Sequence, residues 1–432
     1  MDVPSRIVLP NGLPVIAVEL PHLHTAAITL LVKVGSRHET PATNGLSHFL
    51  EHMLFRGTQS YATAYDLNHA IECLGSTMDA ATSRDSTELS VRVFPDAVEP
   101  SLALLAEIVS TGRFSDIEIE RRVILEEIAD EEDEEGRIVD LDVVAKSTLW
   151  PTAALGFPIA GPPANVQRFG VADLVAHRDR FYVATNAVLA VAGPVSAAEV
   201  HRLAALHLGS LPTGVPSVDV LPAVGCPLPH LKVVQDSGSQ TDVQLCFLAF
   251  PETDPDGVAL QVLLRMLDDG VAARLQRRVC DELGLAYQIG ASLETFRDTG
   301  LLLVEGAVRH EKVPALLEEL GRVLMEVREQ PVEPEELHRA RARTRFSLAQ
   351  RLDSPESTAA WVADGELLGN GETFEERMRR VEQVTAADVQ RVARRVLRPD
   401  GLLVTAVGRL GRSLFSRTRD AHAKLCATLA RG

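Results

Sequence analysis

The chain has 432 residues, of which 46% are hydrophobic, 60 are acidic and 43 are basic. This length predicts two to three domains, and the net charge of −17 argues against a nucleic-acid partner. No uncharged apolar run approaches the length of a membrane span, so we expect no membrane partner either.

The N-terminal segment MDVPSRIVLPNGLPVIAVEL (residues 1–20) predicts two strands joined by a turn at Asn11-Gly12. It resembles neither a secretory signal nor an Arg/Ser-rich transit segment. The five cysteines never occur in CxxC spacing, which predicts a reducing compartment with neither disulfides nor a cysteine zinc site. We therefore expect a cytoplasmic protein. The cysteines are Cys73, Cys226, Cys246, Cys280 and Cys426.

The segment NGLSHFLEHMLFRGT (residues 44–58) predicts an amphipathic helix with Asn44 as its N-cap. His48 and His52 are four residues apart and share a face, so both imidazoles could bind one zinc ion. Glu51 lies where it could act as general base on a zinc-bound water. The HxxEH order is known among zinc peptidases, although an ordinary helix that happens to contain two histidines is the alternative. The predicted apolar stripe is Leu46, Phe49, Leu50, Met53 and Leu54.

The segment ERRVILEEIADEEDEE (residues 120–135) offers carboxylates for the third ligand that a catalytic zinc requires. On a helix, Glu120 and Glu127 are two turns apart and share a face, whereas Glu126 is rotated by about 100° from Glu127. A block of like charges is usually exposed, so residues 130–135 favour a solvated acidic face.

A stretch with five prolines, LPTGVPSVDVLPAVGCPLPH (residues 211–230), indicates a linker between two halves that resemble each other. In each half a strand pattern, at residues 82–93 and 295–308, is followed by two long helical patterns. We predict a duplicated α+β fold in which each domain is a largely antiparallel sheet with helices on one face. The predicted parts are a zinc-binding catalytic domain at 1–213, a linker at 214–230, and a domain without the metal motif at 231–432.

The duplication provides an internal control for the ionisable cluster. If Arg84 aligns with Arg297, the cluster of the first half falls opposite a different set of residues in the second half, so the fold does not require it. Chemistry is therefore expected in the first half. The pairs are His48 with Gln261, Glu51 with Leu264, His52 with Arg265, Glu120 with His338, and Glu127 with Arg345.

The two motifs together resemble the pitrilysin/insulinase family of zinc metallopeptidases, particularly its short two-domain chains such as mitochondrial processing peptidase. The spacing between HFLEHM and ERRVILEE suits that family, and RIVLPNGLPVI, LGSTMDAATSRDSTELSV and GLAYQIGASLETFRDTGLL look like its other conserved stretches. The resemblance implies half of a clamshell that holds one zinc ion per chain. It implies His48, His52 and Glu127 as ligands, Glu51 as catalytic base and Glu120 as an accessory catalytic carboxylate.

The segment MDAATS (residues 78–83) looks like the family's edge strand, which implies that Asp79, Ala80 and Ala81 bind a peptide substrate by strand addition. The family usually has Asn where Asp79 stands. An acid there could disfavour acidic side chains or favour basic ones, and the alternative is that Asp79 caps a turn or bulge.

In the second domain, the family usually carries an arginine seven residues before the tyrosine of GLAY, and this pair binds substrate near the zinc of the opposite half. Here Tyr287 is present but Cys280 replaces the arginine. We interpret Cys280 as a small buried hydrophobic residue rather than a nucleophile. This departure favours a heterodimer with a related chain that supplies the Arg/Tyr pair; a homodimer is the alternative.

The expected function is that of a zinc metalloendopeptidase, a hydrolase that cleaves peptides or small unfolded proteins inside a dimeric chamber. One alternative is a non-catalytic assembly or scaffold subunit of a peptidase-like complex. Another is a dedicated maturation protease for one peptide precursor.

Overall fold

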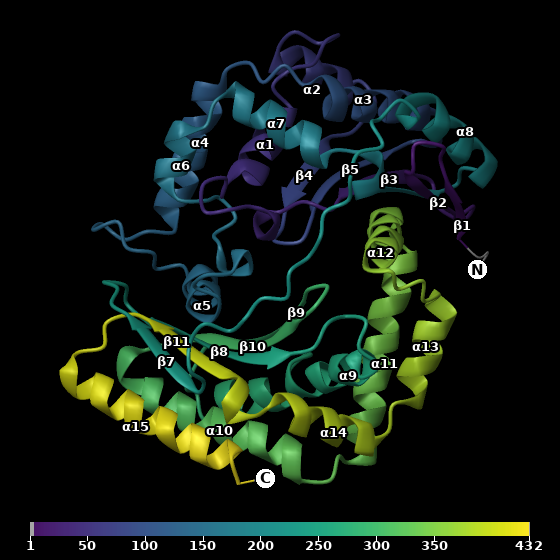
Figure 1. Ribbon diagram of the computed structural model, residues 1–432. Coiled ribbons are helices and arrows are strands. Elements are labelled where there is room, and N and C mark those ends of the chain that lie inside the picture. Colours follow the sequence, from purple (N-terminus) through teal and green to yellow (C-terminus); the bar gives the residue numbers. More distant parts are fainter. Residues whose placement is uncertain (1–3, 432) are drawn as a thin grey trace. The chain divides into compact units, whose positions relative to one another are not determined.

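The computed structural model describes residues 4–431, which form two compact units (Figure 1). The first unit runs to Asp130 and also includes Phe157–Val220 and Ala349–Thr373. The second unit comprises Glu131–Gly156, Leu221–Leu348 and the chain from Phe374 onward. These units differ from the contiguous domains suggested by the sequence, because each half contributes one segment to the other unit.

The first unit contains a six-stranded sheet, counted over residues 4–431, in the order β1-β2-β6-β3-β5-β4. The predicted turn joins β1 to β2 as an antiparallel hairpin, with Gly12 at a φ of +97°. Strands β2 and β6 pair in parallel and the other neighbours pair antiparallel, so the sheet is largely antiparallel as predicted. The strands are β1 (Ser5–Val8), β2 (Pro14–Glu19), β3 (Ala26–Val32), β4 (Met78–Thr82), β5 (Thr87–Val93) and β6 (Ala187–Gly193).

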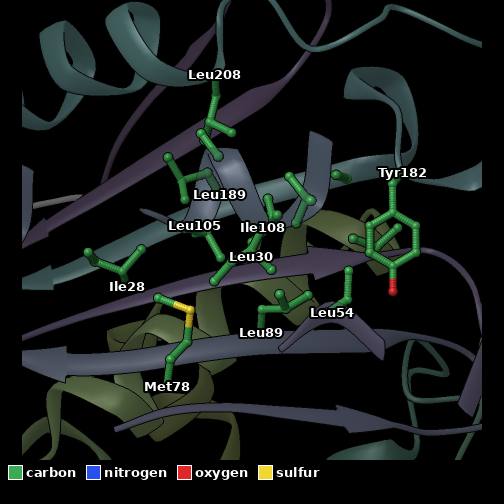
Figure 2. Packing of buried hydrophobic residues seen from close by; sticks show 14 of the residues in the cluster. Ile28, Leu30, Leu54, Met78, Leu89, Leu105, Ile108, Tyr182, Leu189 and Leu208 are labelled. Carbon is green, nitrogen blue, oxygen red and sulfur yellow. The ribbon is translucent and has the colours of Figure 1, made fainter. Parts of the chain in front are cut away.

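Most helices of the first unit pack on one face of this sheet around a continuous apolar core. Figure 2 shows Ile28, Leu30 and Leu89 from the sheet meeting Leu105 and Ile108 from α3, and all five are fully buried. Strand β5 alternates buried and less buried side chains, as a strand with one core face requires, whereas β3 and β6 are buried throughout. The helices are α1 (Leu46–Leu54), α2 (Ala64–Glu72), α3 (Val98–Thr111), α4 (Ile117–Asp130), α6 (Pro163–Arg168), α7 (Val171–Phe181), α8 (Ala197–Leu208) and α12 (Pro355–Leu368).

Helix α12 comes from the second half of the sequence but packs on the opposite face of the first sheet. Its Ala359 and Ala363 are fully buried against an apolar cluster that includes Ala27 and Leu31 of β3 and Ala190 of β6. Small side chains let a helix backbone approach a sheet closely. The sequence predicted helices on one face of this sheet. Helix α12 covers part of the other face as well.

The second unit contains a five-stranded sheet, within the described residues, in the order β7-β11-β8-β10-β9. Here β7 and β11 are the parallel pair. The strands are β7 (His230–Val234), β8 (Thr241–Ala249), β9 (Ile289–Thr295), β10 (Gly300–Val308) and β11 (Leu402–Val407). The helices are α5 (Leu141–Leu149), α9 (Gly257–Leu267), a π-helical segment at Gln276–Glu282, α10 (Val313–Glu329), α11 (Pro334–Leu352), α13 (Phe374–Gln383), α14 (Ala386–Val396) and α15 (Arg412–Leu429).

The two units repeat one topology, which confirms the predicted duplication. The order β2-β6-β3-β5-β4 of the first sheet matches β7-β11-β8-β10-β9 of the second, with the parallel pair at the same place. In chain order α1, α3 and α4 correspond to α9, α10 and α11. The exchanged helices also correspond, since α5 follows α4 and α12 follows α11. Helix α5 packs on the second sheet, where Leu149 and Trp150 lie among buried residues of β8, β10 and β11.

No helix formed by residues 4–431 combines the length and the apolar composition that crossing a membrane requires.

Candidate metal centre

Helix α1 begins one residue later than its sequence suggested. Gly45, not Asn44, is the N-cap. A glycine has no side chain that could accept a hydrogen bond from the helix. Gly45 has a φ of +101°, and a Cβ there would lie 2.6 Å from the carbonyl oxygen of Ala160, so both conformation and space require glycine.

The carboxylate of Glu39 binds the first turn of α1 instead. One oxygen accepts hydrogen bonds from Asn44 Nδ2 at 3.0 Å and from the amide of Gly45 at 2.8 Å, and the other accepts from the amide of Ser47 at 2.7 Å. Glu39 is only 6% exposed. Burial raises its pKa to about 7, although these hydrogen bonds act in the opposite direction. An acid distant from the predicted motif thus anchors the helix that carries it.

The predicted apolar stripe of α1 is buried, so its other face is left for the polar residues. His48, Glu51 and His52 are half-buried on that face. Burial, and secondarily the neighbouring His52, lowers the pKa of His48 to about 4. His48 is therefore a neutral imidazole near neutral pH, which is the form that binds metal. Its Nδ1 is buried and has no hydrogen-bond partner among the described residues.

Helix α4 brings Glu127 to this face. Glu127 Oε2 lies 3.7 Å from His48 Nε2 and 3.5 Å from His52 Nε2, and one ligand atom from each residue lies within 4.8 Å of the others. Ligand atoms of a tetrahedral zinc site are about 3.4 Å apart, given Zn–N and Zn–O bonds near 2 Å. The three residues therefore fit a zinc ion closely, and the fourth position is free of protein ligands among the described residues.

The sequence predicts Val123 and Ile124 as the residues that anchor α4 to the core, and only Ile124 is buried. Ile124 and Ile128 are buried in the core as a helix period requires, whereas Val123 is 41% exposed. Leu125 packs against the core in its place.

Glu120 lies behind His52 rather than beside the ligand atoms. Its Oε2 is 2.9 Å from His52 Nδ1, so the ring donates from Nδ1 and turns the Nε2 lone pair toward Glu127. Its other oxygen forms an ion pair with Arg56. Sequence reasoning missed Arg56, although its position four residues after His52 on the same face was an available signal. Glu120 thus hydrogen-bonds to a ligand residue beside the site, where an accessory carboxylate was expected, and its catalytic role stays a prediction.

Glu51 lies beside the end of strand β4. Burial raises its pKa, while hydrogen bonding by the side chain and backbone of Thr82 lowers it. A carboxylate with a raised pKa next to a metal-binding group is suited to accept a proton.

Strand β4 is an edge strand, paired within the described residues with β5 alone. The predicted substrate-binding residues do not share one face: Asp79 and Ala81 are exposed, whereas Ala80 is packed against the core. The Ala80 side chain therefore points into the core, and only the backbone of Ala80 is available to a bound peptide.

Among the described residues, the positions of the second unit that correspond to His48, His52 and Glu127 do not form a group that could hold a metal ion. Arg265 on α9 donates to Ser347 at 3.1 Å, and Arg345 on α11 pairs with Glu382 at 3.3 Å. Tyr287 is 95% exposed. Cys280 is partly buried against the core, and burial raises its pKa, so the thiol is not activated as a nucleophile.

The chain belongs to the insulinase family of peptidases. Residues 15–162 match the family described as Insulinase (Peptidase family M16), and residues 168–344 match the Peptidase M16 inactive domain. An uncharacterized zinc protease of Mycobacterium tuberculosis is 31% identical over 401 residues, which cover 91% of each chain. An uncharacterized zinc protease of Streptomyces coelicolor is 30% identical over 429 residues, covering 97% of this chain and 92% of its own length.

Solved structures share the fold. A protease from Helicobacter pylori superposes with a TM-score of 0.86 at 21% identity, covering 94% of this chain and 99% of its own. A chain in the structure of Complex III2 from Candida albicans superposes with a TM-score of 0.81 at 16% identity, covering 98% and 99%. At these identities the likeness concerns the fold alone.

Proposed function

We propose that this protein is a zinc-dependent endopeptidase that cleaves peptides or small unfolded proteins. One observation carries the proposal: two histidines and one carboxylate offer ligand atoms within 4.8 Å of one another, and a second carboxylate, Glu51, lies on the same face of α1 as the histidines. The names of the similar bacterial proteins, which call them zinc proteases, support the choice of metal.

In this proposal His48, His52 and Glu127 hold the zinc ion. A bound zinc ion supplies a Lewis acid that polarises a scissile carbonyl and increases the acidity of water. Glu51 accepts the proton of the attacking water at its carboxylate and then delivers it to the leaving amine. Glu120 takes no part in the proton transfer; it keeps the imidazole of His52 in one tautomer and one orientation.

The substrate would bind as an extra strand along β4. Its exposed edge offers unpaired backbone donors and acceptors, which bind an extended peptide with little demand on sequence. Thr82, at the end of β4, lies beside Glu51, so a peptide on this edge would pass the general base.

We further propose that a second chain completes a closed chamber. Cys280 stands where an arginine would assist Tyr287, so the favoured partner is a related chain that carries the Arg/Tyr pair, with a homodimer as the alternative. Purifying this chain alone tests the choice: full peptidase activity from a single species of chain would exclude the heterodimer.

The decisive experiment combines zinc analysis with cleavage of a quenched fluorescent peptide. We expect stoichiometric zinc in both the wild type and Glu51→Gln. Only Glu51→Gln should lose cleavage, because it retains the zinc ion but lacks the general base. Glu127→Gln should lose zinc, whereas Glu126→Gln, one residue away on the exposed side of α4, should retain both zinc and activity. A wild type without zinc, or Glu51→Gln that cleaves at the wild-type rate, would refute the mechanism.

The same experiment also tests two alternative functions. An assembly or scaffold subunit of a peptidase-like complex predicts bound zinc without peptide cleavage, alone or with any partner. A maturation protease for one precursor would use the same chemistry but cleave only that precursor, which a substrate screen would reveal.

A further inference from the structure

Part of the stretch that the sequence predicts as a linker is fastened to the first unit, at residues 217–220. Lys33 Nζ lies 2.6 Å from Asp219 Oδ2, and His38 Nε2 lies 3.1 Å from Asp219 Oδ1. His38 Nδ1 accepts a hydrogen bond from the amide of Gly35 at 3.3 Å, so Nε2 carries the ring proton and donates to Asp219. Both carboxylate oxygens of Asp219 are therefore bound to the first unit.

The backbone of the same segment is bound as well. Lys33 donates from Nζ to the carbonyl oxygen of Ser217 at 2.9 Å, and the amide of Ser217 donates to Asn186 Oδ1 at 2.7 Å. Arg37 donates from Nη2 to the carbonyl oxygen of Val220 at 3.3 Å. Lys33 and Arg37 are buried. A connection that only joins two domains needs none of these contacts, and a buried cation is stable only with its partner.

The side chains that bind this segment come from the connection between β3 and α1. Lys33, Arg37 and His38 all lie in it. The residue after His38 is Glu39, whose carboxylate holds the first turn of α1. A displacement of His38 therefore passes through one peptide bond to Glu39. In this way the connection links Asp219 to the helix that carries the metal-binding histidines.

The same connection also contacts the turn between β4 and β5. Arg37 donates from its amide to the carbonyl oxygen of Arg84 at 3.1 Å and from Nη1 to Asp85 Oδ1 at 2.8 Å. Thr82, the last residue of β4, precedes this turn and forms hydrogen bonds with Glu51. One short stretch of chain thus contacts the linker segment, the start of α1, and the turn that follows the strand beside the general base.

We propose that Asp219 is a positioning residue of the metal centre. Its carboxylate fixes Lys33 and His38, and these fix the connection that carries Arg37 and Glu39. The proposal rests on the proposed function, since it assumes the zinc site and the general base described there. It adds that a segment of the linker between the two halves takes part in holding that site.

Removing the charge of Asp219 perturbs this arrangement. In Asp219→Asn the buried ammonium of Lys33 loses its counter-ion, and a buried charge without a partner moves toward water. The connection that carries His38 and Glu39 is then displaced. Enzyme rates are sensitive to such shifts, since a displacement of about 1 Å can cost about 100-fold.

The experiment uses the full chain and compares Asp219→Asn and Asp219→Glu with two controls. Val218→Ala changes the neighbouring linker side chain, which is 82% exposed. Ala363→Leu changes a buried residue on the sheet face opposite α1 and is the control for lost stability. Zinc affinity is measured by competition with a chelator. The quenched fluorescent peptide gives kcat and KM, at a temperature at which every variant is folded.

We expect Asp219→Asn to weaken zinc affinity about fivefold, less than the loss typical of a residue that contacts a metal ligand directly. Its kcat should fall about tenfold. KM should change by less than about twofold, because the displaced groups act on zinc and on the base rather than on the bound peptide. Asp219→Glu should recover most of both losses, since it restores the charge. Both controls should match the wild type.

The outcomes separate this proposal from the peptidase function. Wild-type zinc affinity and kcat in Asp219→Asn would overturn the positioning role and leave the peptidase function standing. Equal losses in Ala363→Leu would also overturn it, because the effect would then follow stability alone. If the wild type cleaves no peptide but Asp219→Asn still weakens zinc binding, the peptidase function fails and the positioning role stands. A wild type that binds no zinc would refute both.

Discussion

Replacing Glu39 with alanine would test how the helix of the metal centre is held. The Glu39 carboxylate accepts three hydrogen bonds, from Asn44, Gly45 and Ser47, at the start of α1. Asn44 and Ser47 are buried. Alanine would leave these donors without their acceptor, in a place that water enters poorly.

The expected cost depends on pH. Each buried donor left without a partner costs about 1–3 kcal/mol, and water entering the vacated space recovers part of this. We expect a net loss of about 3 kcal/mol in the free energy of unfolding at pH 5.

The wild type itself changes with pH, because burial raises the pKa of Glu39 from 4.5 to about 7. A carboxyl whose folded pKa is raised binds its proton more tightly in the folded state. Its contribution is therefore complete below pH 4.5 and is lost as pH rises through about 7. This shift corresponds to about 2–3 kcal/mol between pH 5 and pH 8. The cost of Glu39→Ala should thus fall to below about 1 kcal/mol at pH 8.

Tryptophan fluorescence can isolate the relevant unit. The chain has two tryptophans, Trp150 in the second unit and Trp361 in the first. In a Trp150→Phe background, urea unfolding followed by Trp361 reports on the first unit alone. Glu72→Ala, an exposed change on α2, should stay within about 0.5 kcal/mol at both pH values. An equal cost of Glu39→Ala at pH 5 and pH 8 would refute the argument from burial, and a negligible cost at pH 5 would refute the argument from hydrogen bonding.

Three further predictions concern the metal centre and the two exchanged helices. Glu120→Ala should weaken zinc affinity about 10–100-fold, measured by competition with a chelator, because His52 loses the partner that orients it. Ala363→Leu should lower the stability of the first unit by about 1–3 kcal/mol, measured by urea unfolding, since Ala363 is fully buried against the sheet; an unchanged midpoint would contradict close packing. Trp150→Ala should cost about 3–5 kcal/mol in the second unit, because the indole is 1% exposed and packs edge-on against Phe296. In calorimetry, the unfolding transition of the second unit should shift to a lower temperature in Trp150→Ala than in the wild type.

Local sequence patterns determined the elements of this protein and the residues of its candidate centre. The apolar stripe of α1 and the i, i+4 spacing of His48 and His52 depend only on helix geometry, so both can be predicted from the sequence. The repeated order of strand and helix patterns predicted the duplication, and the resemblance to a known family singled out Glu127. The structure then brought Glu127 close to both imidazoles.

Tertiary structure alone decided what surrounds these residues. Glu39 replaced the predicted cap of α1, and Arg56 holds Glu120. The exchange of α5 and α12 between the units joins segments that are far apart in the chain. Helix and strand periods describe which face of an element is apolar, but not which distant segment covers it. That choice depends on packing among whole elements, which no local spacing records.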